Sequence, residues 1–174
     1  MRCLLARKIV GVGLPKDDRS QLWRMGFTIL ETLARDAIVR VRRTLAEAIK
    51  DQPTAPRPII LELARDPAQE VAGPILRDSP VLTERDLVDI ASGDAPAWAQ
   101  TAISERKTVQ AGVSEAIVTR GNVPAVTNLL MNKLAVIDDS TIERVVDGAD
   151  NIVEWHEPLV ARPSLPGGAI TKLA

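Results

Sequence analysis

The sequence predicts an all-α fold, a right-handed α-solenoid in which short helix pairs stack on one another. Apolar residues recur at spacings of three and four, which is the period of a helix and not of a strand. The chain contains three Trp, one Phe and no Tyr, so a β-sandwich or barrel would lack the aromatic residues that sheets favour. A register of aliphatic residues also recurs every 27 to 30 positions, which indicates a repeat architecture.

The repeat is clearest in two segments that share the sequence Leu-Ala-Arg-Asp, residues 33–36 and 63–66. Each is followed, eight positions after its Leu, by a Val. Each repeat is therefore predicted to be two short helices, the first containing the aliphatic pair and the second starting near the Val. The aliphatic pair recurs at Ile90-Ala91, Ile117-Val118, Val145-Val146 and Leu173-Ala174. The position eight residues after the first member of the pair is occupied in successive repeats by Val41, Val71, Trp98, Ala125 and Val153.

Helix pairs of this length cannot bury their apolar faces alone, so successive pairs must stack. We expect a single solenoid domain over residues 1–174, with N-terminal capping helices over 1–28 and about five HEAT-like repeats over 29–172. At about 28 residues these repeats are shorter than the roughly 40–47 residues of ordinary HEAT or armadillo repeats. The C-terminal repeat is expected to be incomplete.

Glycines and prolines predict where individual helices end or bend. Gly93, Gly121 and Gly148 are expected to follow the first helices of three repeats in the left-handed conformation. The segment from Gly11 to Lys16 is predicted to be a turn between two N-terminal helices. Pro74 and Pro158 fall inside predicted second helices and are expected to kink or shorten them.

The composition excludes several classes of protein and site. Lys and Arg total 22 and Asp and Glu total 23, which argues against a bulk polyanion binder and against an acidic tail. One Cys and one His cannot supply a zinc site from this chain alone. No apolar run has the length of a signal-peptide core or of a membrane span, so we expect a cytoplasmic protein that does not bind a membrane.

No catalytic, cofactor-binding or metal site is predicted. The chain has no Gly-x-Ser-x-Gly motif to place a nucleophile. The carboxylates at Asp138-Asp139 and between Asp147 and Asp150 stand beside predicted helix starts, where Asp side chains cap free backbone N–H groups. We therefore interpret both acidic clusters as helix caps.

The three tryptophans are candidates for either the core or a binding surface. Trp155-His156 has two interpretations: a recognition patch, because Trp is enriched at binding hot spots, or a Trp155 that fills the core beside a His156 on a helix flank. Trp98 is expected in the core because it is equivalent to Val41. Trp23 is also expected to be a core residue.

The charge distribution predicts a basic N-terminal half. Residues 1–57 contain twelve Lys and Arg against six Asp and Glu, a balance of +6, and residues 58–174 contain ten against seventeen, a balance of −7. Such a polarised chain favours oriented docking to a charged partner. In the second helix of the first repeat, Arg43 is expected to pair with Glu47 and Arg40 with Asp36. Arg42 has no acidic residue at helical spacing, so it is the main candidate for partner binding, with Arg40, Arg43, Trp155 and His156 as further candidates.

Three sequence runs resemble the bacterial repeat family called domain of unknown function 2336. They start at Leu33, at Val71 and at His156, where the chain reads His-Glu-Pro-Leu-Val-Ala-Arg-Pro-Ser-Leu-Pro, and the resemblance extends from about Gln21 to the end. The resemblance implies a HEAT-like, all-helical fold. Because the family has no established activity, it implies no catalytic residue.

The sequence favours a non-enzymatic scaffold or adaptor that binds another protein along the solenoid surface. The alternative is nucleic-acid binding through the basic N-terminal half, with DNA-glycosylase-like base excision as its enzymatic extreme. Leu173-Ala174 is expected in the first helix of a further, incomplete repeat, in which Ile170 and Leu173 lack part of their packing. We therefore expect either a longer natural protein or self-association through the C-terminal end.

Overall fold

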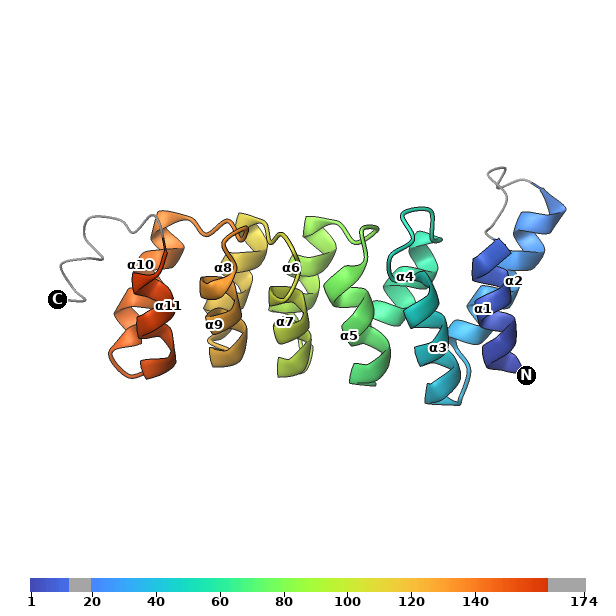
Figure 1. Ribbon diagram of the computed structural model, residues 1–174, viewed down its shortest axis with the longest axis horizontal. Coiled ribbons are helices and arrows are strands. Elements are labelled where there is room, and N and C mark those ends of the chain that lie inside the picture. Colours follow the sequence, from blue (N-terminus) through green and yellow to red (C-terminus); the bar gives the residue numbers. More distant parts are fainter. Residues whose placement is uncertain (13–19, 163–174) are drawn as a thin grey trace. The chain divides into compact units, whose positions relative to one another are not determined.

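The computed structural model describes residues 1–12 and 20–162, and within these ranges every regular element is a helix (Figure 1). The predicted all-α fold is therefore confirmed for these residues. Their β-type pairing is limited to an isolated parallel bridge between Val109 and Ala135. The elements are α1 (Arg2–Val12), α2 (Gln21–Ala34), α3 (Val39–Ile49), α4 (Arg57–Ala64), α5 (Gln69–Asp78), α6 (Glu84–Ser92), α7 (Ala97–Ser104), α8 (Ala111–Arg120), α9 (Val123–Met131), α10 (Asp139–Ala149), the 3₁₀ helix η1 (Val153–Trp155) and α11 (His156–Val160).

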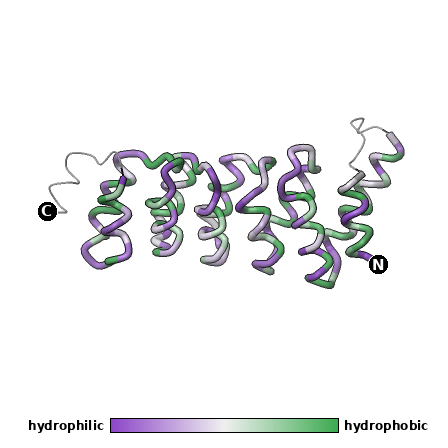
Figure 2. Tube along the Cα trace, in the orientation of Figure 1, coloured by the Kyte–Doolittle hydropathy of each residue, from purple (hydrophilic) through white to green (hydrophobic). Residues whose placement is uncertain are grey.

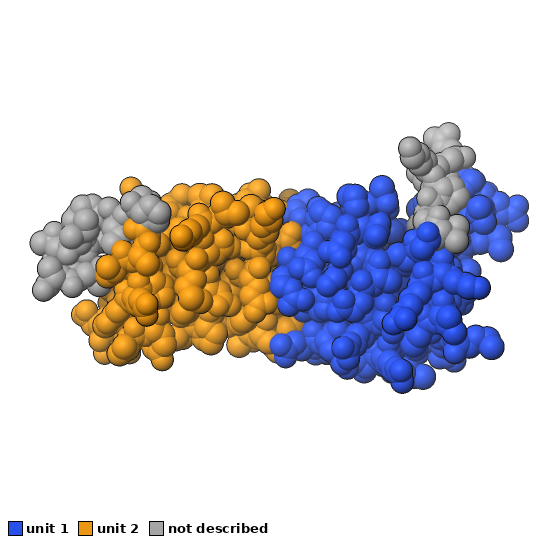
Figure 3. Space-filling view, in the orientation of Figure 1, with its two compact units in different colours: residues 1–83 blue, residues 84–174 orange. Residues whose placement is uncertain are grey.

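The chain divides into two compact units, unit 1 (Met1–Thr83) and unit 2 (Glu84–Ala174), shown in Figure 3. Unit 1 contains α1 to α5, and unit 2 contains α6 to α11 with η1. The single domain over residues 1–174 stays a prediction. The predicted boundary between capping helices and the first repeat, at residue 28, falls inside the continuous helix α2.

In unit 1 the helices pack both within pairs and between successive pairs. Within pairs, α2 packs against α3 and α4 packs against α5. Between pairs, α3 packs against both α1 and α5, and α2 packs against α4. The second helices of the pairs therefore form one layer, which α1 extends, and the first helices form another.

Unit 2 repeats this arrangement with three pairs: α6 with α7, α8 with α9, and α10 with η1 and α11. The first helices pack in the order α6, α8, α10, and α9 packs against α7 on one side and against η1 and α11 on the other. Hydrophilic and hydrophobic residues are interleaved along the helices of both units (Figure 2), as expected where one stripe of each helix is buried.

The predicted repeat register identifies the buried residues of the first helices. The first residue of the repeated aliphatic pair is buried in all five repeats in which the structure describes it: Leu33, Leu63, Ile90, Ile117 and Val145. At the later position, Val41, Val71 and Ala125 are also buried. Two equivalents differ from the expectation, since Trp98 is half-buried and Val153 is exposed.

Val153 is exposed because the last pair does not enter its second helix in the usual way. The chain forms the 3₁₀ turn η1 before α11, and this turn brings Trp155 into the core in place of Val153. The indole N–H of Trp155 donates to the carbonyl of Val123, 3.5 Å away. A Cβ on Gly148 would lie 3.2 Å from the Trp155 ring, so a larger residue there would require the ring to shift by a few tenths of an ångström.

One of the three predicted helix-ending glycines has the left-handed conformation. Gly121 follows α8 with φ +69°, whereas no other described residue has positive φ. The expectation was wrong for Gly148, which lies within α10 and makes room for Trp155, and for Gly93. Pro74 is buried inside α5 and does not end it, and α11, which contains Pro158, has five residues.

Side-chain hydrogen bonds to backbone carbonyls join successive pairs in unit 2. Asn122 Nδ2 donates to the carbonyl of Ala97 at 2.7 Å, and Asn132 Nδ2 donates to that of Arg106 at 2.8 Å. The guanidinium of Arg162 donates to four carbonyls at the end of α9 and in the turn after it, those of Leu129, Leu130, Asn132 and Ala135. Desolvation lowers the pKa of Arg162.

Two predicted features lie outside the described residues: Gly13–Lys16 of the expected N-terminal turn, and the incomplete C-terminal repeat with Ile170 and Leu173. Among the helices in residues 1–12 and 20–162, none combines the length and apolarity needed to cross a membrane.

The register predicts how much individual side chains contribute to stability. Leu63 is fully buried, so Leu63→Ala should lower the free energy of unfolding by roughly 2–5 kcal/mol. Leu22 on α2 is exposed, and Leu22→Ala should change it by less than about 0.5 kcal/mol. Urea unfolding followed by circular dichroism gives both values, and equal values would contradict the register.

Candidate functional site

The two Leu-Ala-Arg-Asp segments form matching turns between the helices of their pairs. Asp36 Oδ1 accepts from the backbone N–H of Ile38, and Asp66 Oδ1 accepts from that of Ala68, both at 2.9 Å. In each case a short acidic side chain closes the turn that leads into the second helix. The sequence repeat is thus a structural repeat of the turn.

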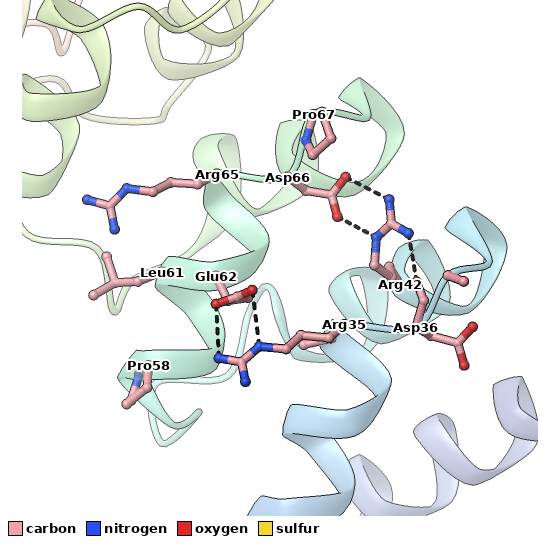
Figure 4. Close-up of a pocket in the computed structure, with 11 residues that line it drawn as sticks. Arg35, Asp36, Arg42, Pro58, Leu61, Glu62, Arg65, Asp66 and Pro67 are labelled. Atoms are coloured by element: carbon pink, nitrogen blue, oxygen red, sulfur yellow. Dashed lines mark hydrogen bonds and ion pairs between the residues drawn. The ribbon is translucent and has the colours of Figure 1, made fainter.

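Arg42 joins these two turns (Figure 4). From α3, its Nε and Nη2 donate to the two carboxylate oxygens of Asp66 at 2.5 and 3.1 Å, and its Nη1 donates to the carbonyl of Asp36 at 2.7 Å. The side chains of Arg42 and Asp66 are 14% and 6% exposed. Arg42 was the main candidate for partner binding because it has no acidic residue at helical spacing, and its structural partner, Asp66, lies one repeat away.

The pKa shifts follow from these bonds. The hydrogen bond to Asp66 raises the pKa of Arg42. The backbone N–H of Ile38, together with a hydrogen bond from Arg2, holds the pKa of Asp36 below its ordinary value. Both charged forms are thereby favoured in the fold.

A similar ion pair is formed by α1, the neighbour of α3 in the second-helix layer of unit 1. Arg2 Nη1, from α1, donates to Asp36 Oδ2 at 2.8 Å. An Arg in the second-helix layer therefore reaches the Asp at the end of the next first-layer helix twice, as Arg2 to Asp36 and as Arg42 to Asp66.

Further ion pairs connect the basic helix α3 and its surroundings to the following pair. Arg43 binds Glu70 at 3.2 Å, and Lys50 binds Asp78 at 3.1 Å. Arg35, just after α2, binds Glu62 at 3.3 Å. Part of the charge asymmetry seen in the sequence is thus neutralised inside unit 1.

Two pairings expected within the first repeat are replaced by others. Arg43 pairs with Glu70 in place of Glu47, which pairs with Lys50 at 3.2 Å. Asp36 binds Arg2, where Arg40 had been expected. Both expectations were wrong for the same reason. Charged groups of a neighbouring helix compete with the oppositely charged groups at i,i+4 along the chain.

Arg42 and Asp66 line an open pocket of about 600 Å³. Its charged lining consists of Arg35, Asp36, Arg42, Glu62, Arg65 and Asp66. Most of these charges are paired with one another, as Figure 4 shows, while Arg65 points away from the pairs. The pocket therefore presents little uncompensated charge to a ligand.

A second hollow, of about 380 Å³, lies between α1 and α3. It is lined by Arg7 of α1 and by Arg40, Arg43, Thr44, Glu47 and Ala48 of α3. Arg7 and Arg40 are exposed and make no side-chain ion pair or hydrogen bond within the described residues. Three guanidinium groups thus converge on one hollow beside a single carboxylate.

Trp155 and His156, the other candidate binding residues, have different positions. Trp155 is buried, which agrees with its interpretation as a core residue in unit 2. His156 is exposed, and its Nε2–H donates to the carbonyl of Ala149 at 2.7 Å. Trp23 was expected in the core, but it is half-buried and stacks on Phe27 with ring centroids 5.0 Å apart.

Arg40 and Arg43 were candidates from the sequence pattern, whereas Arg7 was not. The signal was present, because α1 contains three basic residues and no acidic one. The sequence does not reveal, however, that α1 packs on α3. Among residues 1–12 and 20–162, no three His, Cys, Asp or Glu side chains lie close enough to share a metal ion.

Comparison with known proteins gives a family match. Residues 71–174, more than half of the chain, match the model of domain of unknown function 2336, described as "Uncharacterised protein conserved in bacteria". No curated protein and no solved structure matches the chain.

The partly buried Arg42–Asp66 pair should matter far more to stability than the exposed pair beside it. Arg42→Ala leaves the carboxylate of Asp66 desolvated without its main partner, so we expect the free energy of unfolding to fall by about 2–3 kcal/mol. Arg43→Ala, in which both partners are more than half exposed, should cost less than about 1 kcal/mol. Chemical denaturation of the two variants tests this, and equal losses would contradict the structural role of Arg42.

Proposed function

The chain belongs to the bacterial family domain of unknown function 2336, and from this premise we propose that it is a non-enzymatic protein-binding scaffold. In this proposal its helix pairs are HEAT-like repeats of a right-handed α-solenoid. The layered packing of first and second helices within each unit supports this architecture.

The observation that carries the function is the hollow between α1 and α3. Arg7, Arg40 and Arg43 approach it from two neighbouring helices. A guanidinium group presents a planar set of donors that matches a carboxylate with two parallel hydrogen bonds. Arg7 and Arg40 have these donors free within the described part of the chain, so they are available to an incoming acidic side chain.

The size and charge of the hollow favour a short acidic segment of another protein. A volume of about 380 Å³ accommodates a few side chains of a partner. Carboxylates also lie at and beside the hollow, Glu47 paired with Lys50 and Glu70 paired with Arg43, and they disfavour a continuous polyanion such as a nucleic-acid backbone more than a peptide whose acidic residues are spaced. The acidic-peptide partner is therefore favoured over the nucleic-acid alternative.

Arg43 contributes to this surface in a different way from its two neighbours. It already binds Glu70, although its side chain remains 56% exposed. A partner carboxylate could share this guanidinium, whereas Arg42 is occupied by Asp66 and by the Asp36 carbonyl. In the proposed function, the binding role that the sequence assigned to Arg42 therefore passes to Arg7 and Arg40.

A peptide array tests the proposal. Fifteen-residue peptides of graded Asp and Glu content should bind the chain with an affinity that rises with acidic content and falls with salt. Arg7→Glu and Arg40→Glu should each weaken binding of the best peptide by about tenfold, since each replaces an attraction with a repulsion. The control is Arg24→Glu, which makes the same charge change at an exposed position on α2 outside the hollow.

Two outcomes would contradict the proposal. One is peptide binding that is weakened equally by all three variants, which would indicate bulk charge and no defined hollow. The other is tighter binding of a labelled DNA duplex than of any peptide, with loss in the same variants, which would favour the nucleic-acid alternative.

A further inference from the structure

Helix α1 has an exposed apolar face on the side away from α3. Ala6 is fully buried, and Met1, Leu4, Leu5 and Lys8 lie around the opposite side of the helix. Leu4 is 65% exposed, and Lys8 is exposed at the same surface. We call the stripe formed by Met1, Leu4, Leu5 and Lys8 the basic stripe.

The helical segment from η1 through α11 has an exposed face of the opposite charge. Trp155 and Leu159 are buried against the rest of unit 2, while Val153 and Val160 are 74% and 70% exposed. Glu154 and Glu157 are exposed in the same short segment. We call the set Val153, Glu154, Glu157 and Val160 the acidic stripe.

Among the described helices, α1 and α11 each have a neighbouring helix on only one side within the layer of their own unit. In unit 1, α3 packs between α1 and α5, and in unit 2, α9 packs between α7 and the η1–α11 segment. The packing of α3 in unit 1 and of α9 in unit 2 shows that a second-layer helix of either unit accepts a neighbour on both sides. For α1 and α11, the side without such a neighbour carries exposed Leu or Val side chains.

We propose that the basic stripe of one copy binds the acidic stripe of a second copy. The apolar side chains of each stripe would pack on one another, as they do between neighbouring helices within each unit, and Lys8 would face Glu154 and Glu157. The charges select this pairing, because two basic stripes or two acidic stripes would place like charges together.

This contact is heterologous, since the two copies contribute different surfaces to it. Such a contact generates an open chain of copies unless its geometry closes into a ring. Each stripe covers only a few helical turns, so the contact is smaller than a standard protein–protein interface, and association should be weak and concentration-dependent. It is also separate from the acidic-peptide hollow, which uses Arg7 and Arg40.

Sedimentation velocity of the 174-residue chain over a wide concentration range tests the proposal. We expect the average mass to rise continuously with concentration and to fall when salt is added. Lys8→Glu alone and Glu157→Lys alone should each raise the dissociation constant about fivefold or more. Arg24→Glu and Glu143→Lys make the same charge changes at exposed positions outside the stripes and should leave association unchanged.

Mixing the two stripe variants gives the sharpest result. In an equimolar mixture, the carboxylate introduced by Lys8→Glu in one variant can face the ammonium introduced by Glu157→Lys in the other. The unaltered Lys8 and Glu157 of the two variants can also pair, so association should be stronger in the mixture than in either variant alone.

Two outcomes overturn the proposal. One is a chain that stays monomeric at all concentrations. The other is association of the Lys8→Glu variant alone at the wild-type level, because the charge of Lys8 would then play no part in the contact. Circular dichroism confirms that each variant keeps its helices.

Discussion

The helices of this chain are too short to bury their apolar stripes individually, and the packing within each unit follows from this constraint. Both α4 and α7 contain eight residues, which is well below the length at which an isolated helix is stable in water. Leu63, Ile75 and Ile103 are nevertheless fully buried, because the helix of each packs both on its partner helix and on a helix of a neighbouring pair within the same unit. Stability therefore depends on contacts between successive pairs as much as on the pairs themselves.

The polar contacts that join successive pairs differ between the two units. In unit 1 they are mainly ion pairs, from Arg42 to Asp66 and from Lys50 to Asp78. In unit 2 they are mainly side-chain hydrogen bonds to backbone carbonyls, from Asn122, Asn132 and Arg162. Added salt screens exposed ion pairs but has little effect on hydrogen bonds to neutral carbonyls, so the exposed contacts of unit 1, such as that of Arg43 with Glu70, are the more sensitive to salt.

The sequence was sufficient to predict the helical class and the buried positions. Leu33, Leu63 and Ile90 recur in a register that a 3.6-residue period can interpret without tertiary information. It failed at Val153, where the 3₁₀ turn η1 shifts the register and Trp155 enters the core. A short 3₁₀ turn leaves no periodic signal in the sequence, so the shift could not be predicted.

Charged residues were harder to predict than apolar ones for a physical reason. A helical wheel identifies partners at i,i+3 and i,i+4, but the carboxylate that binds Arg42 is 24 residues away, in the turn of the next pair. The repeated Leu-Ala-Arg-Asp segment marked the position of Asp66 without showing which cation reaches it. The hollow lined by Arg7 and Arg40 likewise depends on the packing of α1 on α3, which no local pattern reports.

We infer that Arg42 and Asp66 couple the first two helix pairs of unit 1. A double-mutant cycle of Arg42→Ala and Asp66→Ala tests it most directly, with opening free energies taken from native-state hydrogen exchange at the buried amides of Leu45 in α3 and Ile75 in α5. We predict a coupling of about 1.5–3 kcal/mol that appears in both helices. Losses that add to within about 0.5 kcal/mol would show that the two residues act independently and would contradict the claim.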